Sequence, residues 1–600
     1  MVKKLNNADL EKKGVHPNYY LIYQLWKELT AKKTLDTYQF RIMNTLSALK
    51  ELVKVINQRL NRFHNSNRNI DDCKNETFEI IKNDLILKEY YPSIQTRLLT
   101  QIKKKTDTDS QQKVLLYHLD YVLKILEPQY FDNLIKDLKK NLDNNNIDNI
   151  FLETNQLVSC CSSRGWSDQA LYNVIDIFHN SNNDSTSWEN FEKKLCSSTL
   201  DYHILLSFKV RVINAPGQKH ELAKEHVLNE INNMGIGSME KEEILKNYPY
   251  LKEMENKIEE NTYLQISIQS YDMYSASHLA ISKLANILNI LSFYHLTEPW
   301  SIRDISWFTI DMKNQYAQSF KSKDLYSTYD YLDGANKIFR TSKELDEKAD
   351  QSIKAKLQAT YSYANMGKVS YAQTEKYINT WVALESLCRT EMYENIIENI
   401  LDTVPPALCL RYIYRRFRNF AEDCVRCNIN FEFVNDSVNL KHPSKEDMVK
   451  DIIRIMNDNV IYGELYKKCE VNKLLVKRCE DMHLIATDGN QMFMQIDNHY
   501  KNVRRQLSRL YRLRNEIAHS ALHDETSLIR YIEHLNDYLS KFVAEIVMCW
   551  NKNHENSIEN IFEMIKDNYK EYVDIKSSKK GANPIQLLED LRKTGIISLI

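Results

Sequence analysis

Glycine and proline are scarce in this chain. Eleven glycines and ten prolines occur in 600 residues. Because these two residues make tight turns and interrupt regular structure, their scarcity argues against a fold of many short strands and hairpins. The sequence therefore predicts a mainly α-helical protein, and its length allows several domains with sizeable cores.

Long apolar runs and a disulfide framework are also missing. No stretch reaches the ~18 consecutive apolar residues that a membrane-spanning helix needs, and the N-terminus leads into no apolar core of signal-peptide length. The 11 cysteines follow no spacing typical of a disulfide-rich secreted domain. We therefore expect a cytoplasmic protein with reduced thiols and no membrane partner.

A net charge is almost absent, since 80 lysines and arginines balance 81 acidic residues. Without a global basic field, any surface that binds nucleic acid must be local. The chain has no Walker A lysine motif, and Gly235-Ile236-Gly237 is too short for a dinucleotide loop. Neither ATP- nor NAD-dependent chemistry is predicted, and we expect no cofactor.

Changes in the apolar pattern divide the chain into five parts. Strands are predicted only in the second part, at 200–213 and at 262–270, which alternates clearly, with 300–311 as a third candidate. Helices are predicted between them at 220–234, 241–261 and 275–294. The parts are an N-terminal helical region (1–195), a small mixed α/β domain (196–320), a helical connector (321–369), a C-terminal helical bundle (370–570) and a tail (571–600). In the bundle, we expect helices at 370–401, 405–428, 495–520 and 525–550, with Pro405-Pro406 beginning the second and an insertion at about 429–494.

The predicted helix at 495–520 has two contrasting faces at ~100° per residue. Its apolar face holds Val503, Leu507, Leu510, Leu513, Ile517 and Ala521. Its opposite face holds Glu516, His519 and a basic stripe, which we define as Lys501, Arg504, Arg505, Arg509 and Arg512. A solvated face is the ordinary explanation for such charges, but a basic stripe can also track an RNA backbone. Its sharing a face with His519 favours RNA.

Two charged residues break the apolar pattern. Arg514 points into the middle of the apolar face, and Glu385 occupies a core-facing position of the helix predicted at 370–401. Because an unpaired buried charge is costly, we expect these two residues to form one ion pair. On the polar face, Asn515 and His519 lie one turn apart, so the amide can orient the imidazole.

The spacing Arg514-Asn515-x-x-x-His519 late in a long helix resembles the signature of HEPN domains, a helical-bundle family rich in metal-independent ribonucleases. The stretch Tyr377-Ile-Asn-Thr-Trp-Val-Ala-Leu-Glu-Ser-Leu-Cys388 is similar to the first helix of the ApeA-like branch, which is associated with bacterial anti-phage defence. The resemblance covers about residues 370–550. It implies that 370–570 is an HEPN-like nuclease domain, with a composite active site assembled across a homodimer from Arg514, Asn515, His519 and Glu385.

The chemistry that this resemblance implies needs no metal. The 2′-hydroxyl of single-stranded RNA, with transfer and messenger RNA as candidate substrates, attacks the adjacent phosphate while His519 moves a proton and Arg514 stabilises the developing charge. Because Arg514 and His519 point ~140° apart on an ideal helix, either the helix distorts or the partner subunit completes the site. We expect an abortive-infection effector with a phage-derived trigger. The alternative is a non-catalytic HEPN module that binds RNA or protein and senses a phage component.

Two groupings are weighed as metal sites. Cys424-Val-Arg-Cys427 has the spacing of half a zinc site, with Cys469, Cys479 and His483 as later candidates, but reduced structural thiols are the favoured interpretation. His519 and His523 lie one turn apart, next to Asp524 and Glu525, yet we expect the helix to end near Ser520. We therefore predict no metal site.

Overall fold

Helices dominate the protein. The structure is a computed structural model that describes residues 7–31, 43–62, 67–179, 184–213, 219–298, 306–321, 335–370, 372–429, 432–433, 436–437, 445–520, 525–554 and 557–578. The predicted mainly helical fold is confirmed, and the described strands form a small five-stranded antiparallel sheet and a second sheet of two short strands, which was not predicted. Among the described residues, none of the helices combines the length and apolar composition that a membrane span requires.

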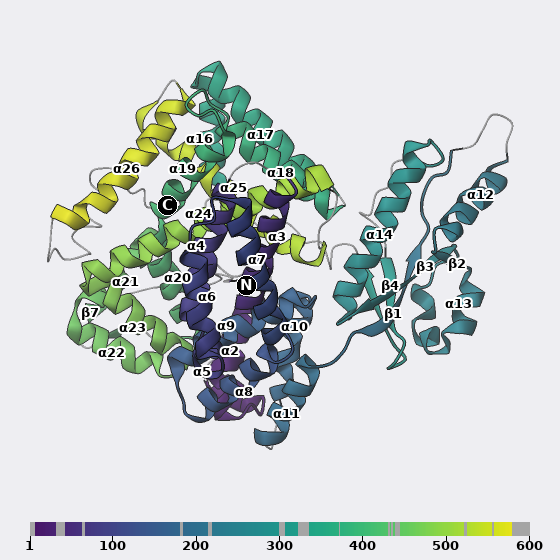
Figure 1. Ribbon diagram of the computed structural model, residues 1–600, viewed down its shortest axis with the longest axis horizontal. Helices are drawn as coiled ribbons and strands as arrows, with labels where there is room; N and C mark the ends of the chain where they lie inside the picture. Colours follow the sequence, from purple (N-terminus) through teal and green to yellow (C-terminus); the bar gives the residue numbers. More distant parts are fainter. Residues whose placement is uncertain are drawn as a thin grey trace.

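The N-terminal helical region wraps around its own core, at the centre of Figure 1. Trp26 is fully buried there, and its indole nitrogen donates to the Leu171 carbonyl at 2.6 Å. The helices are α1 (Asn7–Lys12), η1 (Pro17–Tyr19), α2 (Tyr20–Thr30), α3 (Thr45–Leu60), α4 (Arg68–Asn83), α5 (Leu85–Tyr90), α6 (Pro92–Lys103), α7 (Asp109–Leu126), α8 (Tyr130–Asp143), α9 (Ile147–Ser163), α10 (Asp168–Val174), η2 (Ile175–Phe178) and α11 (Asp184–Leu195).

A five-stranded antiparallel sheet follows, in a lobe set to one side in Figure 1. The strand order is β2-β3-β1-β4-β5, from β1 (Leu200–Ser207), β2 (Gly237–Met239), β3 (Tyr263–Ser270), β4 (Ser306–Asp311) and β5 (Tyr316–Lys321). Helices α12 (His220–Asn233) and α14 (Met273–Phe293) pack on one face, while α13 (Lys241–Asn247) and η3 (Pro249–Lys257) pack on the other.

The predicted strands of this lobe are present, but their bounds and number differ from expectation. Strand β1 covers only part of its predicted range, and residues 300–305 of the range predicted for β4 lie outside the described residues. The short β2 and the edge strand β5 were not predicted. The helix expected at 241–261 is also divided, since α13 ends at Asn247 and Pro249 begins the 3-10 helix η3. Proline has no N–H to continue the α-helical hydrogen bonds across that point.

The C-terminal helices share one apolar core, which also contains side chains from the connector and the insertion. The elements are α16 (Ala335–Lys348), α17 (Gln351–Val369), α18 (Gln373–Cys388), α19 (Ile396–Cys409), α20 (Tyr412–Arg426), β6 (Glu432–Phe433), β7 (Asp436–Ser437), α21 (Lys445–Asn457), α22 (Asn459–Cys469), α23 (Lys473–Thr487), α24 (Gly489–Ser520), α25 (Glu525–Asn553) and α26 (Ile558–Ser578). The predicted tail lies outside the described residues from 579 onward.

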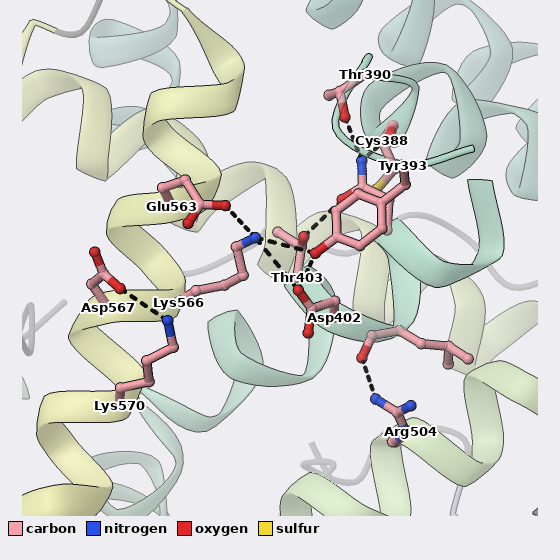
Figure 2. A network of polar contacts seen from close by, with 12 residues as sticks. Cys388, Thr390, Tyr393, Asp402, Thr403, Arg504, Glu563, Lys566, Asp567 and Lys570 are labelled. Carbon is pink, nitrogen blue, oxygen red and sulfur yellow. Dashed lines mark hydrogen bonds and ion pairs between the residues drawn. The ribbon is translucent and has the colours of Figure 1, made fainter. Parts of the chain in front are cut away.

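The prolines do not begin a helix, contrary to expectation. The helix predicted at 370–401 ends at Cys388, and Pro405 and Pro406 lie inside the next helix, α19. Because Pro405 has no N–H, it cannot donate to the Leu401 carbonyl one turn earlier. Arg504 Nη1 donates to that carbonyl instead, at 3.1 Å, and Figure 2 shows its guanidinium pointing at α19. A side chain from α24 thus compensates for the proline.

Candidate functional site

Helix α24 carries the candidate motif and packs against α18. Three residues of its predicted apolar face, Val503, Leu507 and Leu510, are fully buried, while Leu513 and Ile517 are partly buried against the same core. The Tyr377 hydroxyl donates to the Leu510 carbonyl at 2.5 Å. This bond joins the two helices that carry the stretches from which the HEPN resemblance was drawn.

The expected ion pair between Arg514 and Glu385 is present. Arg514 Nη2 lies 3.5 Å from Glu385 Oε2. The Glu385 side chain is 9% exposed and the Arg514 side chain is 30% exposed. The carboxylate is therefore deep in the packing between α18 and α24, while the guanidinium still reaches solvent.

Asn515 contributes to holding the guanidinium. Its Oδ1 accepts a hydrogen bond from Arg514 Nη1 at 3.1 Å. The backbone of His519 belongs to α24, and its side chain lies outside the described part of the chain, as do His523 and Asp524. The contact expected between Asn515 and His519 therefore stays a prediction. What the structure brings together is Glu385, Arg514 and Asn515.

Lys501 and Arg504, in the first half of the basic stripe, form polar contacts within the C-terminal helices. Lys501 is exposed and pairs with Asp497 at 2.6 Å, one turn earlier on α24. Arg504 is bound to the Leu401 carbonyl, and Arg505 is half-buried. Lys501 and Arg505 keep access to solvent, as expected for a surface that binds RNA.

The second half of the stripe is covered by the N-terminal region. Arg509 Nε lies 3.1 Å from Glu51 Oε2, and Arg509 Nη2 lies 2.5 Å from Glu76 Oε1. Arg512 pairs with the other oxygen of Glu51. Both arginines are buried, so the expectation of a solvated stripe is wrong for them. RNA contact by these residues stays a prediction that requires α3 and α4 to move.

The electrostatics of this cluster favour the charged form of the carboxylate. Burial alone would raise the pKa of Glu51, but the charges of Arg512 and Arg509 outweigh it and lower the pKa to about 2. At neutral pH the Glu51 carboxylate is therefore fully ionised between two guanidinium groups. Glu51 and Glu76 were not predicted as site residues, because no local sequence signal links them to a helix more than 400 positions away.

The four cysteines considered as zinc ligands lie close together in the structure. Cys424, Cys427, Cys469 and Cys479 are all buried. The contact with Cys424 and burial raise the pKa of Cys469, and burial raises the pKa of Cys424. Such thiols stay protonated and unreactive, which fits the favoured structural interpretation. His483 Nδ1 lies 2.8 Å from the Met456 carbonyl, and its ring stacks on Tyr462.

Within the described residues, no group of three or more His, Cys, Asp or Glu side chains is arranged to hold a metal ion. No family model, curated protein or solved structure matches the chain. The case for a function therefore depends on the geometry around α24 and on the residues that carry the HEPN resemblance.

Proposed function

We propose that the C-terminal helices form an HEPN-like domain and that the protein is a metal-independent endoribonuclease of the ApeA-like, anti-phage type. The observation that carries this proposal is the Arg514–Glu385 pair. A helix of the Trp-x-x-Leu-Glu type holds, through Glu385, the arginine of an Arg-Asn-x-x-x-His helix at 3.5 Å. The pair was expected from two separate helical patterns, and chance surface charges would not be expected to meet in a packed interface.

The proposed chemistry uses three side chains of the motif. The 2′-oxygen attacks the adjacent phosphorus, the bond to the 5′-oxygen breaks, and the products carry a 2′,3′-cyclic phosphate and a 5′-hydroxyl. His519 takes the 2′-hydroxyl proton or donates one to the leaving oxygen. Arg514 stabilises the charge on the non-bridging oxygens, and its 30% exposure leaves part of the guanidinium able to meet a phosphate. Glu385 and Asn515 position it.

A homodimer completes the proposed site. On one straight helix, Arg514 and His519 point ~140° apart, so a single copy does not aim both groups at one phosphate. Two copies of α24 that meet in a symmetric dimer supply two arginines and two histidines to one site. The trigger that starts cleavage during infection would be a phage component.

The decisive experiment is RNA cleavage by the purified full-length protein in EDTA. Losing a general acid or base lowers a rate by ~10²–10⁴-fold, so His519→Ala should lose cleavage by about that factor. His226→Ala is the matched control, because His226 is an exposed histidine on α12 of the sheet lobe. End mapping should find 2′,3′-cyclic phosphates. Products with 5′-phosphates, or activity lost on chelation, would instead indicate a metal-dependent nuclease.

A second candidate function is a non-catalytic module that binds RNA or protein and senses a phage component. The burial of Arg509 and Arg512 favours the protein-binding form of this module, because these groups already have carboxylate partners and are not available to RNA in this arrangement. The two functions differ in one cellular result. Growth arrest on overexpression should disappear in His519→Ala if the protein is a nuclease and persist if it is an interaction module.

A further inference from the structure

The N-terminal region meets the C-terminal helices along a seam of ion pairs that mostly run in one direction. Carboxylates come from the first 195 residues and cations from the C-terminal helices. In the described part of the chain, pairs of this kind include Glu28 with Arg478, Glu51 with Arg509 and Arg512, Glu76 with Arg509, Asp148 with Lys477 and Asp168 with Arg530. The pairs of Lys54 with Glu516 and Arg68 with Glu398 run the other way. This bias brings an acidic face onto a basic one.

Over α24, polar contacts hold this seam. The apolar side chains of the N-terminal and C-terminal helices form separate cores, and among the side chains that the structure describes, Leu474 of α23 is the C-terminal residue that joins the N-terminal core. Helix α4 lies against α24 (Figure 1), with Ser508 Oγ 3.5 Å from Asp72 Oδ2, and α3 contacts α24 through the ion pairs of Glu51 and Lys54. Polar interfaces between parts of one chain resemble those of transient complexes, which can separate.

The Glu51 carboxylate occupies the position that a nucleic-acid phosphate would need. One of its oxygens meets Arg509 and the other meets Arg512, which lie three residues apart and hence on one helix face. Guanidinium groups bind carboxylates and phosphates through the same planar, charge-assisted hydrogen bonds. A phosphate that entered this face would therefore have to displace Glu51 and Glu76.

We propose that α3 and α4 are an intramolecular cover over an RNA-phosphate-binding face of α24, with Glu51 and Glu76 standing in for phosphates. RNA reaches Arg509 and Arg512 only after this cover has moved, so the N-terminal region regulates the candidate site. The inference rests on the proposed function, because RNA is the ligand that it excludes.

Binding of a short, fluorescently labelled single-stranded RNA to the full-length protein tests the cover. The background is His519→Ala, so that cleavage does not interfere. Glu51→Gln with Glu76→Gln removes both carboxylates and should tighten binding by about tenfold or more at low salt. Two newly available cations should also steepen the dependence of affinity on salt by about 1.4 in log–log slope. Adding Arg512→Gln should reverse most of the gain.

The matched control removes two acidic charges from the same region without touching the seam. Glu127 pairs with Lys50 of α3 at 2.8 Å, and Asp71 of α4 is exposed and lies 4.0 Å from Lys74 of its own helix. Glu127→Gln with Asp71→Asn should therefore leave RNA affinity unchanged. Equal tightening in this control would show a general charge effect and overturn the cover.

A milder variant covers the case in which burying two uncompensated arginines prevents folding. Lys54 is half-exposed at the rim of the seam and pairs with Glu516 at 2.5 Å. Lys54→Glu places two carboxylates face to face and should raise RNA affinity and hydrogen exchange in α3. Adding Glu516→Lys restores an ion pair and should return both towards wild type. The proposal is overturned if RNA affinity is unchanged in every variant of Glu51, Glu76 or Lys54 that folds.

Cleavage measured in parallel separates this inference from the proposed function. If Glu51→Gln with Glu76→Gln, made with His519 intact, binds RNA more tightly but does not cut it, the cover is supported and the nuclease function is refuted. If cleavage depends on His519 and its rate is the same in wild type and in Glu51→Gln with Glu76→Gln, the nuclease function is supported and the cover is refuted.

Discussion

Removing either partner of the Arg514–Glu385 pair should destabilise the protein, and by unequal amounts. Arg514→Ala leaves the Glu385 carboxylate, 9% exposed, without its counter-charge. Glu385→Ala leaves Arg514, which is 30% exposed and still bonded to Asn515. Because the guanidinium can turn to solvent and the carboxylate cannot, we expect the arginine substitution to cost more.

The exposed fractions of the two side chains determine how much stability each substitution should cost. Breaking a fully buried pair from one side costs ~3–5 kcal/mol, whereas a solvent-exposed pair contributes about 0–1 kcal/mol. With 3.5 Å between the charged atoms and one partner partly solvated, we expect about 2–3 kcal/mol for Arg514→Ala and about 1 kcal/mol for Glu385→Ala. Replacing both by apolar residues, as Glu385→Leu with Arg514→Met, should recover most of the stability.

Thermal unfolding followed by circular dichroism, together with RNA cleavage, measures both effects. A loss of 2–3 kcal/mol corresponds to a fall in Tm of roughly 4–12 °C for a folded unit of about 200 residues, the size of the region 370–570. Lys570→Ala is the control, since Lys570 pairs with Asp567 on the exposed face of α26 (Figure 2) and should change little. The double variant should be stable and inactive. An Arg514→Ala protein that melts like wild type, or a Glu385→Ala protein that is the less stable of the two, would refute this account.

Two further predictions concern the seam and the assembly. The pKa of Glu51 falls on folding from 4.5 to about 2, so its contribution to the free energy of unfolding, about 3 kcal/mol, is present above pH 4.5 and is lost as the pH falls through the folded pKa. Urea unfolding at decreasing pH should show this loss in wild type and a flatter profile in Glu51→Gln. Light scattering across concentrations should find a homodimer, and a strictly monomeric protein that still cleaves RNA would contradict the composite site.

The sequence patterns were most informative where one period dominates. Strand β3 was expected at 262–270 and is found at Tyr263–Ser270, because its side chains alternate between two faces. Helix α24 was expected at 495–520 and is found at Gly489–Ser520, so it begins earlier than predicted, while residues 521–524 beyond it lie outside the described part of the chain. The helix predicted to begin at Pro405 was wrong, because proline usually begins or breaks a helix but here lies inside α19. Its tolerance inside α19 depends on Arg504, which is distant in sequence.

The candidate site was predictable in part for the same reason. A helical wheel detects a charge in an apolar stripe, so it found Arg514 and Glu385 as partners. It does not detect a second layer that covers a polar face, so Arg509 and Arg512 were expected to be solvated. Their carboxylate partners lie 433 to 461 positions away. A pattern confined to one helix holds no information about contacts of that range.

The sequence separation within this seam also fixes an order of events on the ribosome. Glu51 is synthesised 461 residues before Arg512, which at bacterial and eukaryotic elongation rates of ~5–20 residues per second is roughly 20–90 s earlier. Helices α3 and α4 have therefore left the exit tunnel long before α24 is made. Each nascent chain presents its carboxylates first, and the arginines emerge only after their partners have been made.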